Sequence, residues 1–251
     1  MLRYALVMLV ACSKPPHDAS PIPGEGEAGV EPGGPPPAGI GGHGLAFDPF
    51  ASQHAPMIST PAFATSASGS TMIVGIGRGT AAVFDAAGRA PTDNLGNTPY
   101  QLIGAEEHYE AYPQSSAAIY AFPSMTGGAN TIVSTMVPMT DEITIAAVEV
   151  TGATKVSGLW NEVGSDAPQT SQSITTTGPA TLVAFWWGED DKAMRTAVPD
   201  GGFVVIDSVL TAGELVECAV AAKSVTAAGT YNVTWAATPA QAAMLWLVAV
   251  Q

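Results

Sequence analysis

The chain has 251 residues, of which 22 are Asp or Glu and only 8 are Lys or Arg, so its formal net charge at pH 7 is −14. A surface with this charge repels phosphates and anionic lipid headgroups, which argues against DNA or RNA as a partner. Only two residues are cysteines, which argues against the disulfide framework typical of small secreted domains.

The first twelve residues have the pattern of an export signal. Met1-Leu2-Arg3 is basic, and the apolar run that follows to Ala11 is shorter than the roughly 20 residues of a membrane span. Leu9-Val10-Ala11-Cys12 then resembles the lipobox of bacterial lipoproteins. The resemblance implies cleavage after residue 11, a thioether lipid on Cys12 and, because Ser13 follows rather than Asp, sorting to the outer membrane. A plain signal peptide that ends at a cysteine is the alternative.

Residues 13–44 are rich in Pro and Gly and poor in apolar side chains. Such a segment cannot bury enough surface to offset the entropy lost on ordering. We therefore expect residues 1–11 to be a signal peptide, 12–44 a lipidated and disordered tether, and 45–251 a single folded domain.

Short apolar runs dominate the chain from about Ile58 onward, and Gly, Pro, Asn and Asp separate them. Thr, Val, Ile and aromatic residues are frequent in these runs, as in β-strands. The predicted strands are Thr71–Ile76, Ala117–Phe122, Thr131–Met136, Glu142–Thr151, Thr181–Trp187, Phe203–Ile206, Glu214–Ala222, Tyr231–Ala236 and Met244–Val250. Many short strands with turns between them predict an all-β fold, an antiparallel β-sandwich of the immunoglobulin-like or jelly-roll kind.

Four stretches resemble a module common in bacterial secreted and surface proteins. They are Asp93–Tyr100, Gly127–Thr131, Ala147–Gly152 and Ala228–Trp235, which occur in the order typical of that module, and the stretch Thr175–Thr177 matches as well. The resemblance covers roughly residues 58–251 and implies a β-sandwich that is often appended to surface proteins. It implies no catalytic residues.

Asp93, Asn94 and Asn97 form a short cluster of oxygen-bearing side chains. Such a loop can offer ligands to Ca²⁺, although the full twelve-residue calcium loop and its closing Glu are missing. Asp and Asn also stabilise turns by accepting hydrogen bonds from their own backbone. The sequence therefore leaves a calcium site and a plain turn as alternatives and predicts no other cofactor.

Adjacent tryptophans precede three acids in the stretch Trp186-Trp187-Gly188-Glu189-Asp190-Asp191. In a strand, neighbouring side chains point to opposite faces, so one of Trp186 and Trp187 would face outward. An outward Trp beside Glu189 and Asp190 could stack on a sugar ring or contact a partner protein. Trp160 would add to this surface, as would Tyr109, Tyr112 and Tyr120. The alternative is that both tryptophans are buried.

Catalytic motifs are missing from the sequence, which contains no G-x-S-x-G, H-E-x-x-H or C-x-x-C. Glu106-Glu107-His108-Tyr109-Glu110 is the densest polar cluster, and we expect a solvated loop or edge strand there. Glu107, His108 and Asp190 could form a dispersed hydrolase site only if the fold brought them together. Gly75 to Gly79 is glycine-rich and predicts a twisted or bulged strand end. Cys218 lies in an alternating stretch and is expected to be a buried, inert thiol.

These patterns predict a lipid-anchored protein of the bacterial cell envelope that is not an enzyme. Its expected role is recognition or adhesion, with a glycan or a surface protein as partner and the membrane contacted through the N-terminal lipid. A structural envelope component that associates with itself through sheet edges is the second hypothesis.

Overall fold

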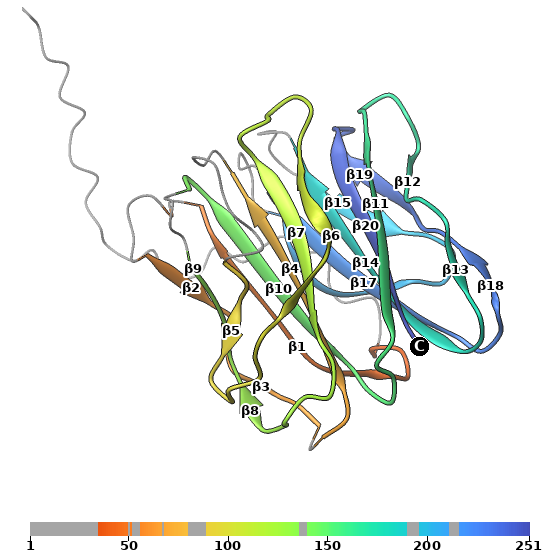
Figure 1. The fold of residues 1–251 in the computed structure, drawn as a ribbon. Helices are drawn as coiled ribbons and strands as arrows, with labels where there is room; N and C mark the ends of the chain where they lie inside the picture. The colour runs from red at the N-terminus through yellow and green to blue at the C-terminus, as the bar shows by residue number, and fades with distance from the viewer. Residues whose placement is uncertain are drawn as a thin grey trace, which may run out of the picture.

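A computed structural model describes residues 35–49, 51, 56–66, 68–79, 89–135, 140–189, 196–210 and 216–251 (Figure 1). Within these ranges the fold is built from antiparallel strands and contains no α-helix. The predicted antiparallel β-sandwich is therefore confirmed. The described part of the chain also has no helix that is long and apolar enough to cross a membrane.

The described residues contain twenty strands, in two sets of ten. The first set is β1 (Ile40–Asp48), β2 (Met57–Ser59), β3 (Phe63–Ala64), β4 (Thr71–Arg78), β5 (Thr92–Asp93), β6 (Gln101–His108), β7 (Ser116–Phe122), β8 (Ala129–Asn130), β9 (Ile132–Thr135) and β10 (Ile143–Val150). The second set is β11 (Val156–Val163), β12 (Gln169–Thr170), β13 (Ile174–Thr176), β14 (Ala180–Gly188), β15 (Thr196–Pro199), β16 (Val204–Val209), β17 (Cys218–Val225), β18 (Gly229–Tyr231), β19 (Thr234–Thr238) and β20 (Ala243–Val250).

Both sets have the same strand order, so the chain is a tandem structural repeat. The large sheets run β1-β10-β4-β7-β6 and β11-β20-β14-β17-β16, and the small sheets run β2-β9-β5 with β3-β8 and β12-β19-β15 with β13-β18. Each strand of the first repeat thus matches the strand ten places later. The pairs β1–β10, β2–β9, β3–β8 and β4–β7 are nested, which is the connectivity of a jelly roll.

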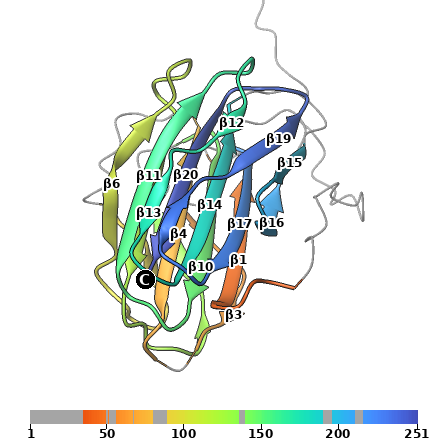
Figure 2. The same ribbon diagram turned by 90° about the vertical axis from the view of Figure 1, so that its right-hand side faces the viewer.

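The two large sheets pack face to face, and Figure 2 shows the second sheet in front of β4, β10 and β1. Strand β1 lies beside β16 on one side, and the equivalent strands β11 and β6 lie side by side on the other. His43 contacts Asp207 across the first of these seams. The matching positions across the second are Gly158 and Ile103, which also adjoin. The repeats are therefore related by an approximate two-fold axis that runs along the strands.

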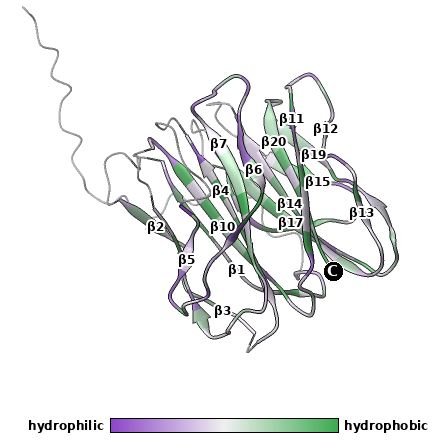
Figure 3. Ribbon diagram, viewed as in Figure 1, coloured by the Kyte–Doolittle hydropathy of each residue, from purple (hydrophilic) through white to green (hydrophobic). Residues whose placement is uncertain are grey.

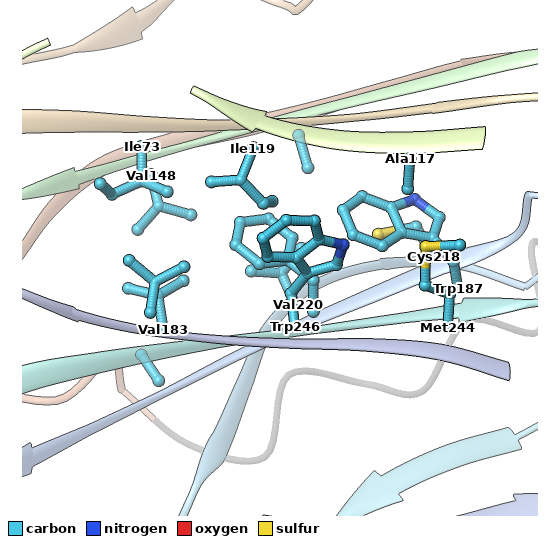
Figure 4. Packing of buried hydrophobic residues seen from close by; sticks show 14 of the residues in the cluster. Ile73, Ala117, Ile119, Val148, Val183, Trp187, Cys218, Val220, Met244 and Trp246 are labelled. Carbon is cyan, nitrogen blue, oxygen red and sulfur yellow. The ribbon is translucent and has the colours of Figure 1, made fainter. Parts of the chain in front are cut away.

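The inner faces of the two large sheets form one continuous apolar core (Figure 4). Ile73, Ile119 and Val148 of the first sheet point toward Val183 and Trp246 of the second. The small sheets cover the outer faces and form two further apolar clusters with them. The central strands β4, β10, β14 and β20 are consequently buried on both faces, and they are the most hydrophobic elements in Figure 3.

The stretch from Gly75 to Gly79 spans the end of β4, as expected, but Gly75 and Gly77 lie within the strand and no bulge occurs there. Both glycines keep regular pairing with β10 and β7. They make room for aromatic rings, because a Cβ at Gly75 would lie 2.8 Å from Cε1 of Phe185 and from Cη2 of Trp187. A Cβ at Gly77 would lie 2.7 Å from Nε1 of Trp187. Since Phe185 and Trp187 are the positions of the second repeat that match these glycines, one repeat is small where the other is large.

The fold begins before residue 45, because β1 starts at Ile40 within the predicted tether. The glycine-rich start of β1 is held by Glu149 of β10, whose carboxylate accepts hydrogen bonds from Gly42 N (3.0 Å), Ser66 N (2.8 Å) and Ser70 Oγ (2.5 Å). Hydrogen bonds to β10 therefore order the start of β1, although its local composition alone predicts disorder. The rest of the predicted tether up to residue 34, the signal region and Cys12 lie outside the described residues.

Candidate functional site

The two ends of the sandwich differ in their connections. Strands β4, β6, β14 and β16 all finish at one end, which we name the loop end. The strand ends there are linked by eight connections: 49–56, 79–91, 109–115, 136–142, 164–168, 189–195, 210–217 and 239–242. The connections 109–115 and 164–168 are the two prominent loops at the top of Figure 1. The opposite end has short turns such as 151–155 and 226–228. Loops carried by a rigid scaffold are the usual place of binding residues, so the loop end is the candidate site.

Glu189 is the most perturbed acid of the loop end. It follows β14 directly and is 3% exposed. Burial, and after it the neighbouring Glu162 and Glu110, raise its pKa to about 9. Glu162 at the end of β11 accepts the backbone N–H of Glu110 through both carboxylate oxygens, at 2.9 and 3.0 Å. Glu189 is therefore protonated at neutral pH and can donate to the Glu162 carboxylate.

Two further polar groups are buried at the loop end. Tyr109 is 2% exposed, and within the described part of the chain its hydroxyl has no hydrogen-bond partner. Burial is the main cause that raises the pKa of Tyr109, and the charge of Glu189 is the next. Arg78 is also buried, which lowers its pKa to about 10, and it donates to Ser134 Oγ (3.1 Å) and Thr135 O (2.6 Å). The loop end thus combines long connections with buried ionisable groups.

Trp186 and Trp187 do not form the predicted recognition surface, because both are fully buried. They do point to opposite faces of β14, but both faces are covered. Trp186 lies under β12 and donates from Nε1 to Gln169 Oε1 at 2.8 Å. Trp187 lies between the large sheets and stacks on Phe185, with ring centroids 5.2 Å apart. The interpretation that expected one outward Trp was wrong, because alternation along a strand does not reveal that a further sheet covers the outer face.

Aromatic exposure at the loop end comes from Tyr112 instead. Tyr112 is 42% exposed in the connection 109–115, beside the exposed Glu110. Trp160 on β11 is partly buried and packs on Trp246 with ring centroids 6.5 Å apart. Tyr109 and Tyr120 are buried. Among the predicted aromatic residues, Tyr112 is therefore the one most open to a ligand at this end, and Asp190 lies outside the described residues.

Asp93, Asn94 and Asn97 lie in one turn, and their oxygens face hydrogen-bond donors. Asp93 Oδ1 accepts from Leu95 N (3.0 Å) and Asn97 N (2.9 Å), and Asp93 Oδ2 accepts from Asn97 Nδ2 (2.8 Å) and Tyr100 Oη (2.9 Å). The side-chain oxygens of Asn94 and Asn97 accept from the backbone N–H groups of residues 131 and 126. This geometry favours the turn interpretation over the calcium site.

The acidic cluster on β6 lies on an edge strand, as one of the two expectations had it. Glu106 Oε1 accepts from Ser116 Oγ at 2.5 Å, and His108 Nδ1 lies 3.0 Å from Pro113 O. Among the described residues, no three His, Cys, Asp or Glu side chains are placed to hold a metal ion. Cys218 is fully buried in the core, and burial raises the pKa of its thiol, as expected for an inert cysteine.

Comparison with known proteins gives no relative for this chain. No protein-family model matches it, and neither a curated protein nor a solved structure does. The functional argument therefore depends on the residues and the geometry.

Proposed function

We propose that the protein is a lipid-anchored recognition module of the bacterial cell envelope, which contacts its partner through the loop end. The observation that carries the proposal is the polarity of the sandwich. Strand β1 starts at the end opposite the loop end, where Gly39 O accepts the backbone N–H of Thr151. A lipid on Cys12 would thus hold the protein from one end and leave the loop end free at the other.

A protein is the partner class favoured by the exposed groups. With Trp186 and Trp187 in the core, the stacking surface that would have favoured a glycan is gone. What remains is Tyr112 beside Glu110, and an exposed Tyr with a polar tip is common at protein interfaces. The surrounding acids Glu107, Glu162 and Asp166 suit a partner with a basic surface.

The binding experiment compares the unmodified protein with Tyr112→Ala and with Val198→Ala. Tyr112 is 42% exposed in a loop-end connection, whereas Val198 is 48% exposed on strand β15 and belongs to none of these connections. Envelope proteins cross-linked to the anchored protein in intact cells are identified, and a glycan array is probed in parallel. We expect Tyr112→Ala to weaken partner binding and Val198→Ala to leave it unchanged. Equal binding by both variants would refute the loop end as the contact surface. Binding to glycans alone would show that the partner is a glycan and not a protein.

The anchor is tested separately with Cys12→Ala. We expect the variant to lose incorporation of a radioactive fatty acid and to leave the membrane fraction. Unchanged membrane fractionation would remove the anchor from the proposal, whatever the binding experiment shows.

Self-association is the second candidate, and it has one observation in its favour. Strand β11 lies at the edge of its sheet, pairs only with β20 among the described strands, and exposes 37% of Leu159. A strand edge of this kind can pair with another chain. Light scattering at high protein concentration tests this candidate, because a strict monomer would exclude it.

A further inference from the structure

Two seams join the repeats, and each contains a contact between ionisable side chains or beside one. Across the seam between β1 and β16, His43 Nδ1 lies 2.6 Å from Asp207 Oδ2. Both side chains are about three-quarters buried, with 28% and 25% of their surface exposed. A short contact between imidazole and carboxylate is strongest when the imidazole is protonated, since it then combines a hydrogen bond with an ion pair.

The seam between β6 and β11 is held by carboxyl groups. Glu162 of the second repeat accepts the backbone N–H of Glu110 of the first repeat through both oxygens. Glu189 is buried beside Glu162, and among the described residues no N–H or O–H group donates to its carboxyl oxygens. Two buried carboxylates side by side repel each other, whereas a carboxyl group and a carboxylate can share one proton. This seam is therefore intact only while Glu189 stays protonated.

We propose that the contact between the two repeats is a proton-dependent latch, closed when His43 and Glu189 carry their protons and loosened when they lose them. The latch goes beyond the proposed recognition role, since it concerns how the two halves of the fold are held together. Its two parts lie on opposite sides of the sandwich, so loss of both protons weakens both seams.

The direction of the pH dependence is the same for both groups. The hydrogen bond to Asp207 raises the pKa of His43 above 6.5, so its contribution is complete below pH 6.5 and is lost as pH rises through the raised value. The pKa of Glu189 rises from 4.5 to about 9, so its contribution is complete below pH 4.5 and is lost as pH rises toward 9. Mild acid therefore tightens the latch, and alkali opens it.

The neighbouring ionisable groups do not reverse this direction. Around His43, Cys218 of β17 has a pKa raised by burial, and Glu149 of β10 is bound to the backbone of β1 and to residues 66 and 70. Around Glu189, the charges of Glu162 and Glu110 favour its protonated form. Tyr109 has a raised pKa and stays neutral over the same range.

The latch is tested by thermal unfolding of the full chain in detergent between pH 5 and 9. The variants are His43→Gln, Glu189→Gln and the double variant, and the controls are His108→Gln and Asp166→Asn at exposed positions. Gln can donate a hydrogen bond to Asp207 or Glu162 without titrating. We expect the unmodified protein and both controls to lose stability as pH rises, each single variant to lose less, and the double variant to be nearly independent of pH. Equal pH dependence in the unmodified protein and the double variant would overturn the proposal.

Amide hydrogen exchange of the unmodified protein gives a readout that does not depend on any variant folding. Between pH 6 and 9, we expect the protection factors of β1 and β6 at the seams to fall by about tenfold or more, the effect of one pKa unit. The central strand β10 should keep its protection. A fall of the same size in β10 and the seams would mean global loosening and would also overturn the latch.

Discussion

At the residue scale, the fit between the repeats comes from unequal residues at matching positions. Gly75 and Gly77 of the first repeat face Phe185 and Trp187 of the second. In a dimer of two identical repeats, all four of these positions would instead be glycine or all four would be aromatic. Two glycine faces would leave a void, and two aromatic faces would collide. These side chains thus favour packing of the first repeat against the second over packing of either repeat against a copy of itself.

Gly75→Val is expected to destabilise the protein by about 1–3 kcal/mol, the usual cost of overpacking a core. The reason is steric, because Phe185 and Trp187 approach the added Cβ to 2.8 Å. Urea unfolding of the variant measures the change. Gly164→Ala is the matched control, since nothing lies within 4 Å of the added Cβ there. If Gly75→Val and Gly164→Ala unfold at the same urea concentration, the close packing is absent in solution.

Local patterns predicted single residues only where the environment was also local. The Asp93 turn follows from the preference of Asp and Asn for bonding their own backbone, and both bonds to Leu95 N and Asn97 N are present. Trp187 could not be placed in this way, because its burial depends on contact with β4, which lies more than a hundred residues earlier in the chain. The loop-end group of Glu110, Glu162 and Glu189 was missed as a group for the same reason.

At the element scale, the repeat explains why the large sheets have their unusual composition. In each repeat the two central strands are covered on both faces, so β4, β10, β14 and β20 are almost continuously apolar. These were the strands that the sequence predicted best. Edge strands β1 and β11 carry Gly, Glu and Asn among their residues and were not predicted as strands, and the end of β6 was predicted only as a loop or an edge strand, since pairing on one side and partial exposure tolerate such residues.

Two separate fragments, 35–152 and 153–251, are expected to associate with each other and not with themselves. Each fragment alone exposes the apolar inner face of its large sheet, and only the other repeat has the matching shape. Analytical ultracentrifugation of the separate and mixed fragments measures this. We expect an equimolar heterodimer upon mixing. Stable homodimers of either fragment would show that the unequal packing does not select the partner.

At the scale of the whole molecule, the two repeats share the largest apolar cluster, and each also has a smaller cluster of its own beneath its small sheets. The main apolar cluster draws its residues from both large sheets, and no boundary divides it. The sequence predicted one sandwich for residues 45–251, and the fold class is confirmed, but the duplication within it was not foreseen. The two halves share little beyond strand spacing, because the packing requires large residues in one where the other has glycine.

Unfolding of the intact protein is expected to be a single cooperative transition. Loss of either repeat exposes the inner face of the other, so neither should persist alone. Scanning calorimetry should give a van't Hoff enthalpy equal to the calorimetric enthalpy. Two resolved transitions would contradict the shared core and would show that the repeats unfold as separate domains.

The approximate two-fold axis makes the order of the two halves in the polypeptide arbitrary. Thr151 after β10 bonds Gly39 before β1, and Gln251 after β20 accepts bonds from Thr154 and Lys155 before β11. The segment 151–155 joins the end of β10 to the start of β11, and a new link between Gln251 and Gly39 would join the equivalent ends of β20 and β1. A permuted polypeptide, read from residue 153 to Gln251 and then from residue 35 to 152, would trace the same fold, and its anchor would leave from the other half.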